Sequence, residues 1–192
     1  NKNVLIPRRE TEELVEYVIK YAKRFNKPSI IDVGTGTGAI AIALSKELNL
    51  PVYASDISPK AIEVARKNVE KTNSKVLLLL GDMLKPYIDR NIKVDILVSN
   101  PPYIREDEEI EKIVKDNEPK IALYAPDNGL FYYEEILKNA SKVLNDKFLI
   151  AFEIGEKQGD DVKELAHKYL KDVKVEIKKD LSDKNRFVFV YN

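Results

Sequence analysis

The chain of 192 residues carries 32 basic and 32 acidic side chains, so its formal net charge at pH 7 is zero. Without a net charge, no global field draws it to nucleic acid or a membrane, although a local basic patch could still bind nucleic acid. It has no cysteine, which excludes disulfides, thiolate metal sites and a cysteine nucleophile. The one histidine, His167, offers almost nothing for a zinc site or a serine–histidine triad, and we expect no bound metal.

Strands and helices are predicted to alternate along the chain. The segment from Glu10 to Arg24 has apolar residues at helical spacing, acidic residues in its first turns and basic ones in its last, and Pro28 breaks it. Further helices are expected at Ala39–Leu48, Pro59–Thr72 (with Ser58 as N-cap), Leu130–Leu144 and Gln158–Leu170. Strands are expected at Ser29–Val33, Val52–Asp56, Lys75–Leu80, Val94–Ser99, Phe148–Glu153, Val173–Lys178 and Arg186–Tyr191.

This alternation predicts an α/β fold, with a seven-stranded, mainly parallel sheet covered by helices on both faces. The last two strands are separated only by Asp180–Asn185, which is too short for a parallel crossover, so they should form an antiparallel hairpin. We expect one domain over residues 1–192, with residues 1–27 as a helix leading into it. The one long connection, Ile104–Gly129, has room for a short helix near Glu108–Val114, and loops of this length are usually functional. No apolar run has the length of a membrane span, and we expect a cytoplasmic location.

A glycine-rich turn follows the first predicted strand, with the sequence Gly34-Thr35-Gly36-Thr37-Gly38. Glycines at alternate positions allow a tight turn and close approach of a ligand, and the next helix favours an anionic group at its amino terminus. Asp56 ends the second strand, 20 positions after Gly36, where a carboxylate would take ribose hydroxyls. After the third strand, Asp82 and Met83 could border an adenine. Three matched strand ends predict a nucleoside site, whereas the G-x-G-x-G spacing does not fit a dinucleotide or phosphate-binding loop.

The fourth predicted strand ends in Ser99-Asn100-Pro101-Pro102-Tyr103. Two consecutive prolines cannot continue a central strand, so the chain should leave the sheet at Asn100, at the edge where open α/β sheets bind ligands. An asparagine amide, two proline-bound carbonyls and a tyrosine ring in a rigid loop suit a planar group that carries –NH2. The same residues could also be a simple turn with an exposed tyrosine.

Together these motifs resemble class I S-adenosylmethionine-dependent methyltransferases that act on planar nitrogen. The wider pattern is similar to the HemK/PrmC family, the release factor glutamine N5-methyltransferases. Residues Ile6-Pro7-Arg8-Arg9-Glu10-Thr11-Glu12 resemble the family's P-R-P-E-T-E, with Arg9 in place of a proline, and Glu153-Ile154-Gly155 with Gln158 resembles its E-I-G-x-x-Q. Three stretches resemble the family's lid pattern, namely Glu118-Pro119, Ala122-Leu123 and Gly129-Leu130. Its closing hairpin is resembled by Lys179-Asp180-Leu181 with Arg186.

Two departures accompany this resemblance. Ala125-Pro126 and Asn128 stand where the family usually has Gly-Gly and Asp, so the lid is expected to differ in shape there. The family's helical amino-terminal domain, which helps to hold the release factor, is expected to be absent from this chain.

The resemblance implies a Rossmann-like fold, S-adenosylmethionine as cofactor with S-adenosylhomocysteine as product, and a release factor as protein partner. The methyl group would go to the glutamine amide nitrogen of a Gly-Gly-Gln motif. Asn100 and Pro101 would accept hydrogen bonds from that amide, Tyr103 would pack on its plane, and Pro102 would keep the loop rigid. Asn100 would also border the cofactor. Arg8 and Thr11 would cap the cofactor or the substrate entrance, and we expect a monomer that binds neither membrane nor nucleic acid directly.

Two other hypotheses remain open at this point. A methyltransferase for the N6 of adenine or the N2 of guanine in DNA or RNA would use the same asparagine and tyrosine on a flipped base. It would need a basic groove, whereas the residues after the motif are acidic: Glu106, Asp107, Glu108, Glu109 and Glu111. A catalytically inactive, cofactor-binding partner subunit is the other hypothesis, and the intact N-P-P-Y argues against it.

Overall fold

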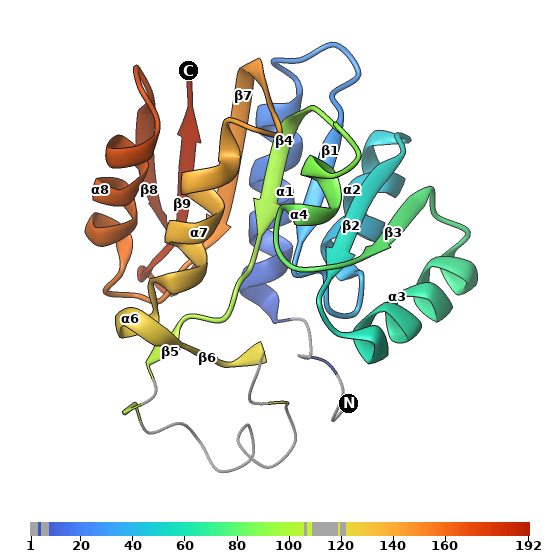
Figure 1. Ribbon diagram of the computed structural model, residues 1–192, viewed down its shortest axis with the longest axis horizontal. Helices are drawn as coiled ribbons and strands as arrows, with labels where there is room; N and C mark the ends of the chain where they lie inside the picture. The colour runs from blue at the N-terminus through green and yellow to red at the C-terminus, as the bar shows by residue number, and fades with distance from the viewer. Residues whose placement is uncertain (1–3, 5–7, 106, 109–118, 120–121) are drawn as a thin grey trace.

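A computed structural model describes residue 4 and residues 8–105, 107–108, 119 and 122–192 of the chain, and every structural statement below concerns these residues. They form a seven-stranded sheet with the order β3-β2-β1-β4-β7-β9-β8 (Figure 1). The strands are β1 Ile30–Val33, β2 Val52–Asp56, β3 Val76–Leu80, β4 Val94–Ser99, β7 Leu144–Glu153, β8 Lys174–Lys179 and β9 Asn185–Tyr191. All neighbours pair in parallel except β9, which is antiparallel to both β7 and β8. The predicted sheet and its closing hairpin are confirmed.

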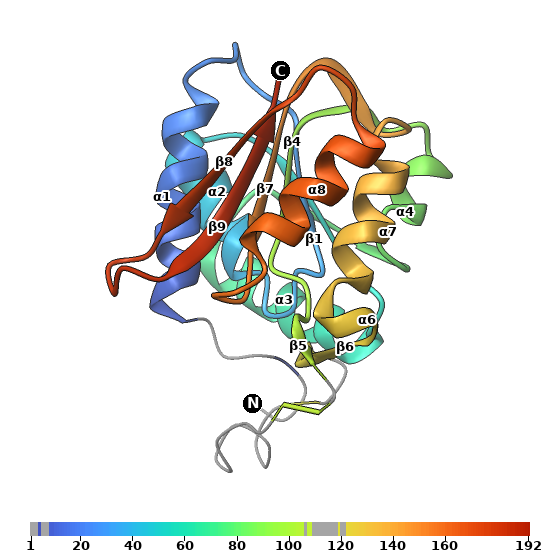
Figure 2. The ribbon, with the colours of Figure 1, turned by 90° about the vertical axis from the view of Figure 1, so that its left-hand side faces the viewer.

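Helices cover both faces of this sheet (Figure 2). One face carries α1 Arg9–Ala22, α2 Ala39–Leu48 and α3 Pro59–Thr72; the other carries α4 Lys85–Ile88, α7 Phe131–Ala140 and α8 Gly159–Tyr169. Because successive side chains of a strand point to opposite faces, Ile30 packs with the first set of helices and Ile31 with the second. The central strands are therefore apolar on both faces, which explains why they appear in the sequence as continuous apolar runs.

Most predicted elements are confirmed within two residues at each end, and Ser58 does cap α3 by accepting a hydrogen bond from the Ala61 N–H. The predicted helix Leu130–Leu144 is wrong at its carboxyl end, because α7 stops at Ala140 and β7 begins at Leu144. Leu144 pairs with Val94, so a long-range contact overrides the local helical pattern there. The helix expected near Glu108–Val114 lies outside the described residues apart from Glu108, which is not helical.

Within the long connection, β5 Ile104–Arg105 and β6 Tyr124–Ala125 form a short parallel pair, followed by the turn α6 Pro126–Gly129. Asp127, Asn128 and Gly129 all have positive φ angles in this turn, and these residue types tolerate the left-handed region best. The part of the chain that the structure describes has no helix long and apolar enough to cross a membrane.

Candidate active site

A cleft opens at the carboxyl ends of β1, β2, β3 and β4, with about 1070 Å³ of empty space when the solvent at its mouth is included. A volume of this order accommodates a nucleoside-sized ligand. Eight of the predicted cofactor residues line it: Gly34, Thr35, Gly36, Thr37, Asp56, Asp82, Met83 and Asn100. The ninth, Gly38, is not among the lining residues. It is the N-cap of α2 with φ 82°, and a Cβ there would come within 3.3 Å of Ala65, so its role is in the turn itself.

The glycine turn exposes bare backbone to the cleft. Gly34 and Gly36 have φ angles of 73° and 55°, and a Cβ built on either would meet nothing within 4 Å. The space above them is thus free for a ligand that approaches the main chain. Behind the turn, the N–H groups of Gly34 and Thr35 donate to the Ser55 carbonyl at 2.9 and 2.8 Å, which holds the turn against β2.

Asp56 is held firmly at the end of β2. Its Oδ2 accepts a hydrogen bond from the Gly36 N–H and its Oδ1 one from the Ser58 N–H, both at 2.9 Å. A carboxylate has about four acceptor sites, so two remain for hydroxyl groups of a ligand. The next residue, Ile57, also lines the cleft with 52% of its surface exposed, and it offers an apolar wall beside the carboxylate.

The N-P-P-Y loop leaves the sheet where the prolines predict it, because β4 ends at Ser99. Asn100, Pro101 and Pro102 line the main cleft, and they also line a second, smaller cavity of about 270 Å³ with open solvent included. The other walls of the smaller cavity are Arg8, Tyr103, Ile104, Ala122, Leu123 and Glu153. One short loop thus borders two adjoining spaces. Of the two predicted capping residues, Thr11 lines the main cleft and Arg8 the smaller cavity.

Comparisons with known proteins decide the family. A family model described as the methyltransferase small domain matches residues 11–118. Release factor glutamine methyltransferases from Bacillus anthracis and Bacillus subtilis are 42% and 44% identical to the chain over 98% of its length, and the matches cover 69% and 68% of theirs. The chain belongs to the release factor glutamine methyltransferase family.

A solved structure agrees with this assignment. The crystal structure of a protein-(glutamine-N5) methyltransferase (release factor-specific) from Alicyclobacillus acidocaldarius superposes with a TM-score of 0.63 at 28% identity, covering 97% of this chain and 94% of that one. The resemblance seen in the sequence motifs is therefore confirmed, and it allows the remaining family motifs to be examined where they lie.

The glutamine of the family's E-I-G-x-x-Q motif holds the end of the N-P-P-Y loop, which is called the substrate loop below after the role proposed for it. Gln158 donates from Nε2 to the Tyr103 carbonyl at 3.0 Å and to the Asn128 carbonyl at 3.4 Å, and its Oε1 accepts from the Gly155 N–H at 2.9 Å. Gly129 is needed at the same place, because a Cβ there would lie 2.2 Å from the Tyr103 oxygen. Gln158 is part of the motif found in the sequence, but nothing in the sequence indicated its role.

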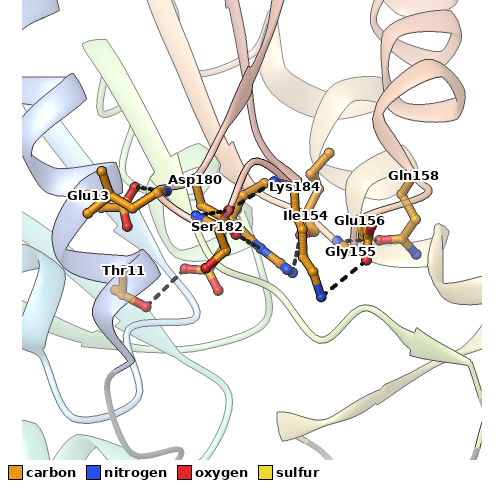
Figure 3. A network of polar contacts seen from close by, with 12 residues as sticks. Thr11, Glu13, Ile154, Gly155, Glu156, Gln158, Asp180, Ser182 and Lys184 are labelled. Carbon is orange, nitrogen blue, oxygen red and sulfur yellow. Dashed lines mark hydrogen bonds and ion pairs between the residues drawn. The ribbon is translucent and has the colours of Figure 1, made fainter.

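The glutamate of the same motif lies behind Asn100. Glu153 is 2% exposed at the end of β7, and it accepts a hydrogen bond from the Thr11 hydroxyl at 2.9 Å (Figure 3). Burial raises the pKa of its carboxyl to about 7, against the opposing effect of nearby Arg186. Arg186 in turn pairs with Asp180 at 3.2 Å and donates to the Ile154 carbonyl at 3.1 Å, which ties the closing hairpin to this motif.

A second buried carboxylate, Asp32, lies at the glycine turn. Its Oδ2 accepts from the Thr35 hydroxyl at 2.5 Å, whereas its Oδ1 has no hydrogen-bond partner among the described residues. Burial raises the pKa of this carboxyl to about 7. An unsatisfied buried acceptor costs free energy, and Asp32 is 0% exposed and not among the residues that line the cleft, so its carboxyl lies beneath the turn. Asp32 lies within β1, two residues before the turn, and nothing in the sequence indicated a function for it.

Among the described residues there is no group of three or more His, Cys, Asp or Glu side chains that could hold a metal ion. His167 lies exposed on α8 and is not among the residues that line the cleft. Lid residues Pro119 and Ala122 line the main cleft, whereas Ile6, Pro7 and Glu118 of the family motifs lie outside the described residues.

Proposed function

We propose that this chain transfers a methyl group from S-adenosylmethionine to the side-chain amide nitrogen of a glutamine in a peptide chain release factor, at the family's Gly-Gly-Gln motif. The observation that carries the proposal is the loop Asn100-Pro101-Pro102, which borders both cavities. The main cleft would hold the cofactor and the smaller cavity the acceptor amide. The loop would then stand where the two reactants meet.

The lining of the main cleft fits S-adenosylmethionine. The bare backbone at Gly34 and Gly36 suits the methionine portion. Asp56 has acceptor sites left for the ribose hydroxyls. The adenine region would lie among Ile57, Asp82 and Met83. When bound, this cofactor supplies an electrophilic methyl group, and its transfer to an amide nitrogen releases one proton.

An amide nitrogen is a poor nucleophile because its lone pair is delocalised into the carbonyl. We infer that the Asn100 side-chain oxygen and the Pro101 carbonyl accept hydrogen bonds from its N–H groups, which raises the electron density on nitrogen and orients it. Tyr103 would cover the amide plane from the wall of the smaller cavity. Orientation of this kind can lower a barrier by roughly 7–11 kcal/mol in favourable cases. Neither a metal nor a nucleophilic side chain is required.

The partner and location follow from this substrate. We infer a monomer of cytoplasmic location that acts on a release factor, with no direct contact to nucleic acid. Beyond the N-P-P-Y loop, Asp107 pairs with Arg105 at 2.7 Å and Glu108 is exposed, so these residues present no net positive charge to a nucleic acid backbone. The chain aligns with about two thirds of the length of its release factor methyltransferase relatives.

The decisive experiment incubates the purified chain with labelled S-adenosylmethionine and a purified release factor. Mass spectrometry should find one added methyl group on the glutamine of Gly-Gly-Gln, and a release factor with glutamate at that position should remain unlabelled. DNA and RNA serve as parallel substrates. Transfer to nucleic acid alone would overturn the proposal, and binding of the cofactor without any transfer would support the inactive partner subunit instead.

A further inference from the structure

Three side chains from distant segments form a chain of polar contacts that ends at Asn100. Glu153, at the end of β7, accepts from the Thr11 hydroxyl at 2.9 Å. Thr11 lies in the first turn of α1, and its oxygen is 3.4 Å from the Asn100 Nδ2 atom. Figure 3 shows the contact that Thr11 makes toward β7. Glu153 and Thr11 are both buried, at 2% and 7% exposure, although Glu153 lines the smaller cavity and Thr11 the main cleft.

The chemistry of these groups sets the direction of each hydrogen bond. A hydroxyl has one hydrogen, and an ionised carboxylate can only accept. The Thr11 hydrogen therefore points to Glu153, and the Thr11 oxygen can only accept from Asn100. It follows that the NH2 end of the Asn100 side chain faces Thr11, and that its oxygen is the end left for another donor.

We propose that Glu153 is a positioning residue, which acts through the Thr11 hydroxyl to hold the Asn100 side-chain amide with its oxygen toward the acceptor nitrogen. This inference rests on the proposed function, in which Asn100 accepts a hydrogen bond from the substrate amide. If the Asn100 amide turned over, its own NH2 would face the substrate NH2, and two donors would meet without an acceptor. The contact to Thr11 excludes that arrangement.

The charge state of Glu153 decides whether this constraint holds. The titratable and charged groups that face it are Arg8 and Glu10 from the start of α1, Tyr103 from the loop after β4 and Arg186 from β9, while Tyr133 of α7 donates to its backbone oxygen. Burial has the largest effect, and it raises the pKa of Glu153 to about 7. Above that pH the carboxylate accepts from Thr11. Below that pH the protonated carboxyl can donate to Thr11, and the directions of the two hydrogen bonds are no longer fixed.

The first test uses nuclear magnetic resonance on the 15N-labelled protein without cofactor or substrate. The side-chain NH2 signals of Asn100, assigned by their absence in Asn100→Ala, should shift with pH as Glu153 ionises. This titration should vanish in Thr11→Val, which keeps the shape but lacks the hydroxyl, and in Glu153→Gln. It should persist in Thr11→Ser. Signals that titrate equally in wild type and Thr11→Val, or that do not titrate in wild type, would overturn the proposal. If Thr11→Val does not fold, Thr11→Ala, which also lacks the hydroxyl, takes its place.

The second test measures turnover with release factor. Thr11→Val should lower kcat by about tenfold to a hundredfold, as expected when a reacting group is misplaced, while the Kd for S-adenosylmethionine stays within about twofold. Thr11→Ser should restore kcat, and wild-type kcat should fall as the pH is lowered through about 7, the pKa of Glu153. Equal losses in Thr11→Val and Thr11→Ser would overturn the positioning role. A wild-type protein without activity on release factor, but with the Asn100 titration intact, would contradict the proposed function and not the positioning of Asn100 by Glu153.

Discussion

The proposed function assigns Asn100 the most direct part in the reaction. It stands at the first position after β4, it lines both cavities, and its amide is held from behind by Thr11. Asp56 has the corresponding place on the cofactor side, because its two oxygens are already oriented by backbone N–H groups. Each of these side chains therefore makes a separate and measurable contribution.

Replacing Asn100 with alanine should lower turnover by at least about a hundredfold, which is the scale observed when one preorganised polar partner is lost. The Kd for S-adenosylmethionine should change little, because the cleft keeps its other walls. Steady-state kinetics and calorimetry measure the two quantities. Asn145→Ala is the matched control, since Asn145 is exposed, lies outside both cavity linings and donates a hydrogen bond to Asp95. Near-normal kcat in Asn100→Ala would refute the acceptor role of this residue.

Replacing Asp56 with alanine should weaken cofactor binding by about 1.5–3 kcal/mol, the range for hydrogen bonds to a charged group. The change also frees the N–H groups of Gly36 and Ser58, so part of the loss comes from a less ordered glycine turn. Calorimetric titration with S-adenosylmethionine gives the affinity, and Asp89→Ala, an exposed aspartate outside the cleft lining, is the control. An unchanged affinity in Asp56→Ala would remove Asp56 from the cofactor site.

At the scale of elements, the site depends on how β4, β7 and α8 are joined at one edge of the sheet. Gln158 directly precedes α8 and connects the Gly155 N–H after β7 to the Tyr103 carbonyl after β4. Gly129, at the end of the turn α6, packs against the same carbonyl. These contacts fix where the substrate loop ends, although Gln158 lines neither cavity.

Replacing Gln158 with leucine, which has a similar size, should leave the Gly155 N–H and the Tyr103 carbonyl without a partner. We expect the free energy of unfolding to fall by about 1–3 kcal/mol, the cost of an unsatisfied buried group, and kcat to fall with it. Urea unfolding and steady-state kinetics measure these changes. Gln158→Glu can still accept from Gly155, but it turns a carboxylate oxygen toward the Tyr103 and Asn128 carbonyls, so it should restore neither stability nor turnover. Wild-type kcat in Gln158→Leu would show that the clamp does not act on the substrate loop.

At the scale of the whole molecule, two carboxylates are buried where the sheet and helices enclose them. Asp32 and Glu153 are 0% and 2% exposed, and burial raises the pKa of each to about 7. The fold therefore favours the protonated form of both groups. The proposed positioning role of Glu153 requires its ionised form, so we expect stability and function to oppose each other at that position.

This opposition predicts how stability depends on pH. Because both pKa values are raised on folding, the folded chain binds more protons than the unfolded chain between the ordinary carboxyl pKa and about 7. These two groups contribute their whole stabilisation of the fold at a pH below the carboxyl pKa of the unfolded chain. This contribution to the free energy of unfolding is lost as the pH rises through about 7. Urea unfolding at about pH 5 and about pH 8 should show the lower stability at the higher pH. Asp32→Asn should reduce this difference, and an unchanged difference would mean that Asp32 is not the titrating group.

Local patterns in the amino-acid sequence were enough to predict the elements of this protein and the place of its glycine turn and N-P-P-Y loop. The seven strands and the closing hairpin follow from apolar runs and connection lengths, and the exit of the chain at Asn100 follows from two prolines that cannot donate to a strand. The G-x-G-x-G turn likewise marks a strand end by its residue types alone. The motifs were specific enough to identify the family before any contact was known.

The contacts between distant side chains, in contrast, could be seen only in the folded structure. Thr11 and Glu153 are 142 positions apart, yet they contact each other behind Asn100, and Gln158 reaches back 55 positions to the Tyr103 carbonyl. The structure also shows that Gly38 is not among the residues that line the cleft. It further shows that β7 begins at Leu144, where the sequence predicted the end of a helix. The physical reason is the same in each case. Strand order and register are set by packing between segments far apart in the chain, and local propensity carries no information about them.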